Sequence, residues 1–248
     1  MRKILHKKGL LIQEEIENLQ KKLNFSIFLL MTKKFYLFIF LILLIFGGIL
    51  ISALFFQKGQ EKKVKKEQIK MAENLSGKKI LMIIAFRDFR DKEYFVPKKI
   101  FEESKIEVKT ASDKKGIAIG ADGGDVQVDY SISEVSVDDF DAIVFVGGPG
   151  ALAHLDNENS YKIARETVEK GKILGAICIS PVILAKAEVL NGKKATVWTD
   201  FTKSQAKILK EKGAIFEEKE VVVDGKIVTG SGPEAAENFA KEIVNLLK

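Results

Sequence analysis

The stretch that decides the fold is residues 172–181, which read Lys-Ile-Leu-Gly-Ala-Ile-Cys-Ile-Ser-Pro. Its first six residues form a short apolar run typical of a buried strand. Pro181 suits the first turn of a helix, because its missing N–H would have no partner there. A residue at such a sharp strand-to-helix turn projects its side chain over the sheet, as a nucleophile elbow does. That residue is Cys178, and the helix N-terminus beside it favours a thiolate. The alternative is a buried, inert cysteine.

Outward from this elbow, short apolar runs alternate with helical stretches from residue 78 to the end of the chain. The pattern predicts strands at 80–86, 107–111, 142–146, 173–177, 195–198 and 214–217, and helices at 94–104, 160–170, 181–189, 202–212 and 233–247. Two hairpin-like excursions are predicted at 116–129 and 221–229. Strands that alternate with helices imply right-handed βαβ units. The sequence therefore predicts an α/β domain with a doubly wound, mostly parallel sheet.

Two further segments follow predicted strands, where ligands bind in doubly wound sheets. Gly147 and Gly148 follow the strand at 142–146, and paired glycines can present backbone N–H groups to an anion. Their spacing matches no nucleotide-binding motif, and the alternative is a tight turn.

The second segment, residues 87–93, follows the first strand and is densely charged. Glu93 could point back to the cysteine, and Arg87 and Arg90 could hold an anionic ligand. The alternative is a solvated charged loop.

Taken together and in this order, these segments resemble the ThiJ/PfpI family, the superfamily of the parkinsonism-associated deglycase and the intracellular protease I. The resemblance covers nearly all of residues 78–248. It rests on the Ala-Ile-Cys-x-x-Pro elbow and on matching segments at 147–148, 184–185, 192–196, 223–225 and 232–233. It implies a flavodoxin-like α/β fold, a homodimer and no cofactor.

The resemblance also implies roles for individual residues. Cys178 would be the reactive thiol, and Glu93 would be its protonated acidic partner. The backbone N–H groups of Gly148 and Ile179 would form an oxyanion site. His154 follows the glycine turn and is a candidate third group on the same rim, although it could equally be a surface histidine.

The sequence departs from the family pattern where histidine is expected. Ile179 follows the cysteine directly, Trp198 stands where one branch has histidine, and Ser231 replaces an arginine. No histidine lies downstream of Cys178, which removes the usual general base of cysteine hydrolysis. This argues against a class I glutamine amidotransferase and weakens a cysteine peptidase.

The function predicted from these features is cysteine-dependent glyoxalase- or deglycase-like chemistry on small 2-oxoaldehydes or their protein adducts. The alternatives are a cysteine redox sensor or stress-response binding protein without turnover, a cysteine peptidase, and a purely structural family member. No metal site is expected, because the chain has one cysteine and two histidines.

A separate N-terminal feature is the run of 22 residues without a charge at 35–56. As a helix it would span about 33 Å, which is enough to cross a bilayer core. It predicts an uncleaved single-pass anchor that binds the lipid bilayer, preceded by a basic, amphipathic tail at 1–34 and followed by a charged linker at 57–77. A cleaved signal peptide is the alternative, but its apolar core is usually shorter.

Charge places the anchored domain and excludes one class of partner. Six lysines follow the span closely and four precede it, which favours a cytoplasmic domain. A start at Met31 would leave two preceding lysines and favour the opposite orientation. Residues 1–77 carry 14 Lys/Arg and 6 Asp/Glu, a charge of +8, whereas residues 78–248 carry 26 and 28, a charge of −2. The domain has no basic footprint, so a nucleic-acid partner is not expected.

Overall fold

The computed structural model describes residues 19–23, 25–26, 28–33, 56–58 and 75–248. The chain divides into two compact units, Met1–Lys66 and Glu67–Lys248. The first unit is helical wherever it is described. The predicted membrane span at 35–56 lies outside the described residues except for Phe56. Among the described residues, no helix is both long and apolar enough to cross a membrane.

The second unit is built on a central sheet of seven strands within residues 75–248. Their order is β11-β12-β8-β7-β1-β3-β6, and all neighbours are parallel except the β11–β12 hairpin. The strands are β1 (Lys79–Ile83), β3 (Glu107–Ser112), β6 (Tyr130–Ser131), β7 (Ala142–Phe145), β8 (Ile173–Ile177), β11 (Val221–Asp224) and β12 (Ile227–Gly230). The chain leaves β1 for β3 on one side and returns to β7 on the other. This reversal makes the sheet doubly wound and confirms the predicted flavodoxin-like α/β class.

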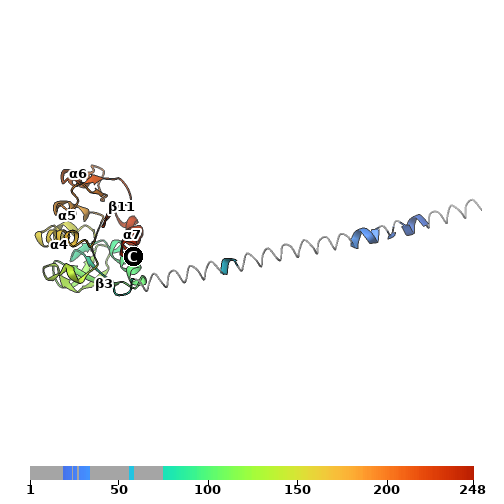
Figure 1. Cartoon of the computed structure of the whole chain (residues 1–248), viewed down its shortest axis with the longest axis horizontal. Coiled ribbons are helices and arrows are strands. Elements are labelled where there is room, and N and C mark those ends of the chain that lie inside the picture. The colour runs from blue at the N-terminus through green and yellow to red at the C-terminus, as the bar shows by residue number, and fades with distance from the viewer. Residues whose placement is uncertain (1–18, 24, 27, 34–55, 59–74) are drawn as a thin grey trace, which may run out of the picture. The chain divides into compact units, whose positions relative to one another are not determined.

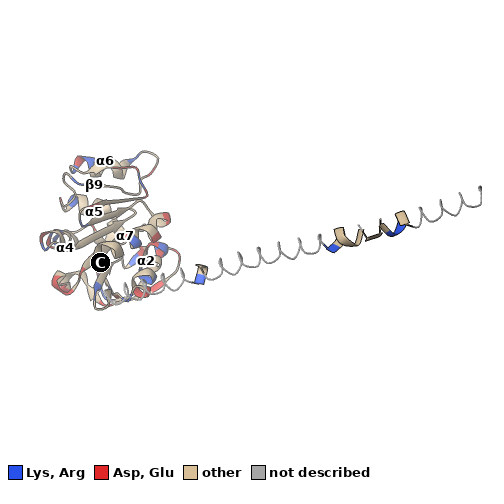
Figure 2. Ribbon diagram, turned by 45° about the vertical axis from the view of Figure 1, so that its right-hand side comes forward, with Lys and Arg blue, Asp and Glu red and all other residues tan. Residues whose placement is uncertain are grey.

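Helices cover both faces of this sheet (Figure 1). The first face packs against α2 (Asp91–Glu103) and α7 (Ala236–Leu247), which lie side by side in Figure 2. The second face packs against α4 (Glu158–Glu169) and α5 (Pro181–Lys186), and α6 (Ser204–Glu211) packs against α5. Strand β1 shows how the sequence serves both layers, because successive side chains of a strand point to opposite faces. Ile80 and Met82 enter the core on the α2 and α7 side, and Leu81 and Ile83 enter the other core.

Two smaller sheets lie apart from the central one. The predicted excursion at 116–129 is a hairpin of β4 (Gly116–Gly120) and β5 (Asp125–Val128), as expected. It is joined by β2 (Arg87–Phe89), a strand that replaces part of the predicted charged loop. The predicted strands at 195–198 and 214–217 are shortened to β9 (Lys194–Ala195) and β10 (Ile215–Phe216), which pair only with each other.

Short helices complete the second unit. They are the 3-10 turns η1 (Ile132–Glu134), η2 (Val137–Asp139) and η3 (Pro233–Ala235), and the α-helix α3 (Ala151–Leu155). The predicted final helix at 233–247 is therefore η3 followed directly by α7.

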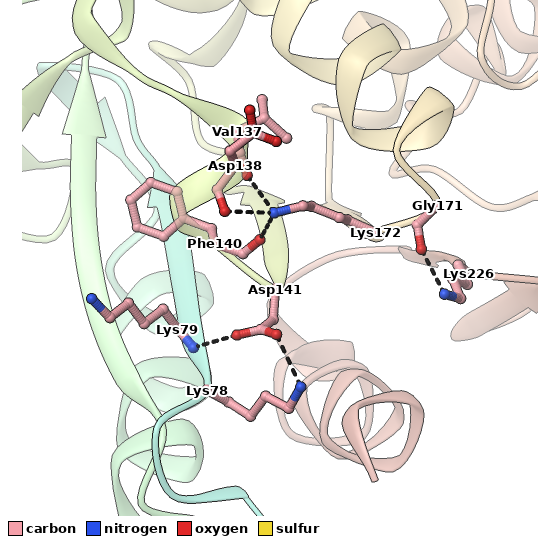
Figure 3. Close-up of polar contacts among 9 residues, drawn as sticks. All are labelled: Lys78, Lys79, Val137, Asp138, Phe140, Asp141, Gly171, Lys172 and Lys226. Carbon is pink, nitrogen blue, oxygen red and sulfur yellow. Dashed lines mark hydrogen bonds and ion pairs between the residues drawn. The ribbon is translucent and has the colours of Figure 1, made fainter.

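Lysines close the sheet at the edge where its parallel strands begin (Figure 3). Lys172, just before β8, donates to the backbone carbonyls of Val137, Asp138 and Phe140 at 2.8, 2.9 and 2.5 Å. Asp141 accepts from the ammonium of Lys78 and from the backbone N–H of Lys79. The candidate residues of the sequence analysis lie at the opposite edge, where the strands end.

Candidate active site

Cys178 occupies the predicted elbow between β8 and α5. Its φ is +64°, a left-handed conformation that is uncommon for a residue with a side chain and is typical of strained functional positions. Two backbone hydrogen bonds hold it there: the Cys178 N–H donates to Gly230 at 2.8 Å, and Trp198 donates to the Cys178 carbonyl at 2.8 Å. The residue is only 9% exposed. The elbow is therefore fixed by neighbouring segments on both sides.

Glu93 comes to the cysteine from the first turn of α2 and is fully buried. Neither carboxyl oxygen has a hydrogen-bond partner of ordinary geometry among the described residues. Gly147 permits the approach, because a Cβ there would lie 2.5 Å from Cys178 Cβ and 2.6 Å from Glu93 Oε2. A glycine at 147 is therefore required for the cysteine and the glutamate to meet.

Backbone N–H groups face the sulfur from two segments. The amides of Gly148, after β7, and of Ile179, after the cysteine, hydrogen-bond toward the thiol and act to lower its pKa. Gly148 has a φ of +122°, and a Cβ there would lie 2.4 Å from the backbone nitrogen of Arg90. The Gly148 turn thus lies tightly against the loop that leads into α2. The structure brings all four predicted residues, Cys178, Glu93, Gly148 and Ile179, to one place.

The cysteine and the glutamate strongly affect each other's protonation. Burial raises the pKa of Glu93 to about 7, against smaller lowering effects of Cys178, the Arg90 charge and the Gly147 amide. Burial and the neighbouring charge of Glu93 raise the pKa of the Cys178 thiol. Two negative charges cannot be accommodated this close together in a poorly solvated site. Near neutral pH the pair therefore holds one negative charge and one proton, which either group can carry.

A cavity of about 300 Å³ opens over the sulfur. It is lined by Arg90, Gly148, Pro149, Cys178, Ile179, Trp198 and Pro233. Trp198, at the position where one branch of the family has histidine, is a wall of this cavity. The two prolines are site residues that the sequence analysis missed. Their only signal was that each follows a glycine after a strand.

His154 does not line the cavity. It lies in α3, and its Nδ1 is 2.9 Å from Oδ2 of Asp113. Although partial burial acts to raise the pKa of Asp113, hydrogen bonding and the charge of His154 hold it below its usual value. The candidate third group is thus engaged by Asp113. Across the described ranges, no cluster of three or more His, Cys, Asp or Glu side chains could hold a metal ion.

The fold and the site together define a class of protein: a flavodoxin-like α/β domain with a cysteine at a strand-to-helix elbow, facing a buried glutamate. The model of the DJ-1/PfpI family matches residues 78–246. The chain belongs to the DJ-1/PfpI family.

Similar proteins support this assignment. The chain is 36% identical to Deglycase PfpI of Pyrococcus furiosus over 168 residues, which are 68% of this chain and 99% of the relative. It is 31% identical to General stress protein 18 of Bacillus subtilis over 175 residues, 69% of this chain and 99% of the relative. The crystal structure of a ThiJ/PfpI domain protein from Brachyspira murdochii superposes with a TM-score of 0.65 at 34% identity, covering 69% of this chain and 98% of that one.

Proposed function

We propose that the domain carries out glyoxalase- or deglycase-like chemistry on 2-oxoaldehydes or their protein adducts, with Cys178 as the nucleophile. The observation that carries this proposal is the Cys178–Glu93 pair, which shares one proton beneath a small cavity lined partly by backbone N–H groups. The similarity to Deglycase PfpI supports the same class of chemistry.

The first step forms a bond between sulfur and carbon. The thiol proton moves to Glu93, and the Cys178 sulfur attacks the aldehyde carbon. The carbonyl electron pair moves to oxygen, where the amides of Gly148 and Ile179 stabilise the negative charge. Glu93 then returns its proton to this oxygen, which gives a neutral hemithioacetal.

The second step moves hydrogen within the substrate. The Glu93 carboxylate takes the proton from the former aldehyde carbon and returns it to the neighbouring carbon, while the hydroxyl proton moves to the second oxygen. The product is a thioester of Cys178, which water hydrolyses to a 2-hydroxy acid and the free thiol. Overall, one 2-oxoaldehyde and one water give one 2-hydroxy acid, so no external oxidant or reductant is needed.

This sequence of steps needs no histidine, because Glu93 moves every proton at carbon. A peptidase would also have to protonate a poor amine leaving group. That role has no obvious carrier here, since His154 is bound to Asp113 outside the cavity. A peptidase is therefore the weaker alternative.

The proposal is tested by lactate formation from methylglyoxal. Cys178→Ala should abolish turnover, and Glu93→Gln should lower it by about 100-fold or more, because it removes the proton carrier. The matched control is Glu103→Gln, which neutralises an exposed carboxylate on the same helix. Turnover that survives in Cys178→Ala would exclude the mechanism.

A redox sensor is the second candidate, favoured by the amides around the sulfur. N–H groups that stabilise an alkoxide could also hold a cysteine sulfinate. The similarity to General stress protein 18 is compatible with a stress-related role. Selective oxidation of Cys178 by peroxide in a protein without methylglyoxal turnover would favour the sensor.

We also propose that residues 35–56 tether the domain to a membrane and that the domain forms a homodimer. The tether rests on the uncharged run of 22 residues, and the lysine count around it favours a cytoplasmic domain. The dimer rests on the family resemblance.

A further inference from the structure

Arg90 gives the cavity over Cys178 a charge that the proposed chemistry does not use. Among the described residues that line this cavity, Arg90 alone carries a formal charge at neutral pH besides the cysteine itself. The other lining residues are glycine, proline, isoleucine and tryptophan. A cation at the edge of an apolar cavity favours a ligand with an anionic end.

The guanidinium of Arg90 is held in place but is only partly used. Its Nη1 donates to the two carboxylate oxygens of Asp122 at 3.1 and 3.3 Å. Asp122 is itself anchored, since its backbone N–H donates to Asp91 at 2.8 Å. No hydrogen bond within the described part of the chain engages Nη2 or Nε of Arg90. The arginine side chain is 32% exposed, so these donors can be reached from solvent.

The unused donors suit a carboxylate. A guanidinium presents N–H groups in a planar fork that matches the two oxygens of a carboxylate. Asp122 opposes an incoming anion, but its side chain is 55% exposed and is therefore well screened by water. The Cys178–Glu93 pair also carries negative charge, which the Arg90 cation offsets.

We propose that Arg90 makes this site selective for reactive carbonyl compounds that carry a carboxylate. The reacting carbonyl would lie at Cys178 beside the amides of Gly148 and Ile179, and the carboxylate would lie against Arg90. The inference rests on the proposed function for its carbonyl chemistry, but the selectivity itself can be tested without turnover.

The first experiment compares two alkylating agents of similar size, iodoacetate and iodoacetamide, at Cys178 in the full chain. Arg90→Gln should lower the ratio of the iodoacetate rate to the iodoacetamide rate by about 10-fold or more. The ratio cancels any change in the thiolate fraction, because both reagents attack the same thiolate at the same pH. The control Arg87→Gln removes a charge three positions away that does not line the cavity. It should leave the ratio unchanged.

The second experiment compares turnover of 4,5-dioxopentanoate with that of 2-oxopentanal, which replaces the carboxylate by a methyl group. The wild-type protein should favour the anion by about 10-fold or more in kcat/KM. Arg90→Gln should remove this preference through KM while 2-oxopentanal turnover persists.

The outcomes separate the two proposals. Equal iodoacetate-to-iodoacetamide ratios in the wild type and Arg90→Gln would overturn the selectivity, even if both 2-oxoaldehydes are substrates. An Arg90-dependent ratio without turnover of either compound would support an anion-selective site and overturn the glyoxalase proposal.

Discussion

A buried glutamate without a hydrogen-bond partner determines the chemistry of this site at the scale of single residues. Glu93 has lost its hydration, and no described group of ordinary hydrogen-bond geometry replaces it. The neutral form is favoured for that reason, and it keeps a proton available beside the sulfur. The sequence placed Glu93 only through its spacing from Pro97 in the family motif. Its burial depends on packing between α2 and the elbow, which no local pattern shows.

The raised pKa of Glu93 predicts a pH-dependent stability. A carboxyl group whose pKa rises from 4.5 to about 7 on folding stabilises the protein fully below pH 4.5, and this contribution is lost as the pH rises through 7. Glu93→Gln stays neutral, so it should gain about 3 kcal/mol in unfolding free energy relative to the wild type between pH 4.5 and 8. Urea denaturation at both pH values measures this. A constant difference, as expected for Glu103→Gln, would contradict the buried neutral carboxyl.

Elements show where local patterns sufficed and where they failed. Strands β7 and β8 lie within a residue of their predicted bounds, because a strand buried on both faces is a continuous apolar run. Helix α2 begins at Asp91, three residues before the predicted start. Its N-cap is Arg90, which makes no side-chain cap hydrogen bond, so the usual start signal is missing. Helix α5 ends at Lys186, just before Glu188 with a φ of +66°.

The same limit applies to the walls of the site. Cys178 and Gly148 belong to motifs that can be recognised along the chain. Pro149 and Pro233 line the cavity because separate segments converge at the ends of β7 and β12. Such convergence depends on the order of strands in the sheet, which local patterns do not specify.

Lys172 predicts a stability effect at the far edge of the sheet. Lys172→Met removes the ammonium that three backbone carbonyls share (Figure 3). Hydrogen bonds to charged groups are worth more than neutral ones, and these carbonyls are partly exposed, so a loss of about 2 kcal/mol is expected by urea denaturation. The exposed control Lys162→Met should cost less than about 0.5 kcal/mol. A loss no larger than that of the control would show that the Lys172 contacts do not stabilise the fold.

At the scale of the whole molecule, the chain joins a DJ-1/PfpI domain to an N-terminal unit that contains an uncharged run at 35–56. The composition alone separates the two, since the net charge of +8 belongs to residues 1–77. The predicted consequence is a reactive-cysteine domain kept at a surface, where it would meet carbonyl compounds locally.

This prediction is tested by membrane fractionation. The full chain should remain in the membrane fraction after a wash at high pH and high salt, whereas deletion of residues 35–56 should release it, because the deletion removes the apolar run. A chain with Lys62 and Lys63 changed to glutamine, but with the apolar run kept, should stay bound. Full release of the intact chain by the wash would contradict the anchor.

The central claim is that Cys178 and Glu93 share one proton and act as a pair. The most direct measurement is the rate of Cys178 alkylation by iodoacetamide as a function of pH, in the wild type and in Glu93→Gln. The account predicts two steps in the wild type, the first near pH 7 and the second well above the ordinary thiol value of 9.0, and a single step in the variant. A single step near pH 9 that is the same in both proteins would show that the two groups titrate independently, and the proposed mechanism would lose its proton carrier.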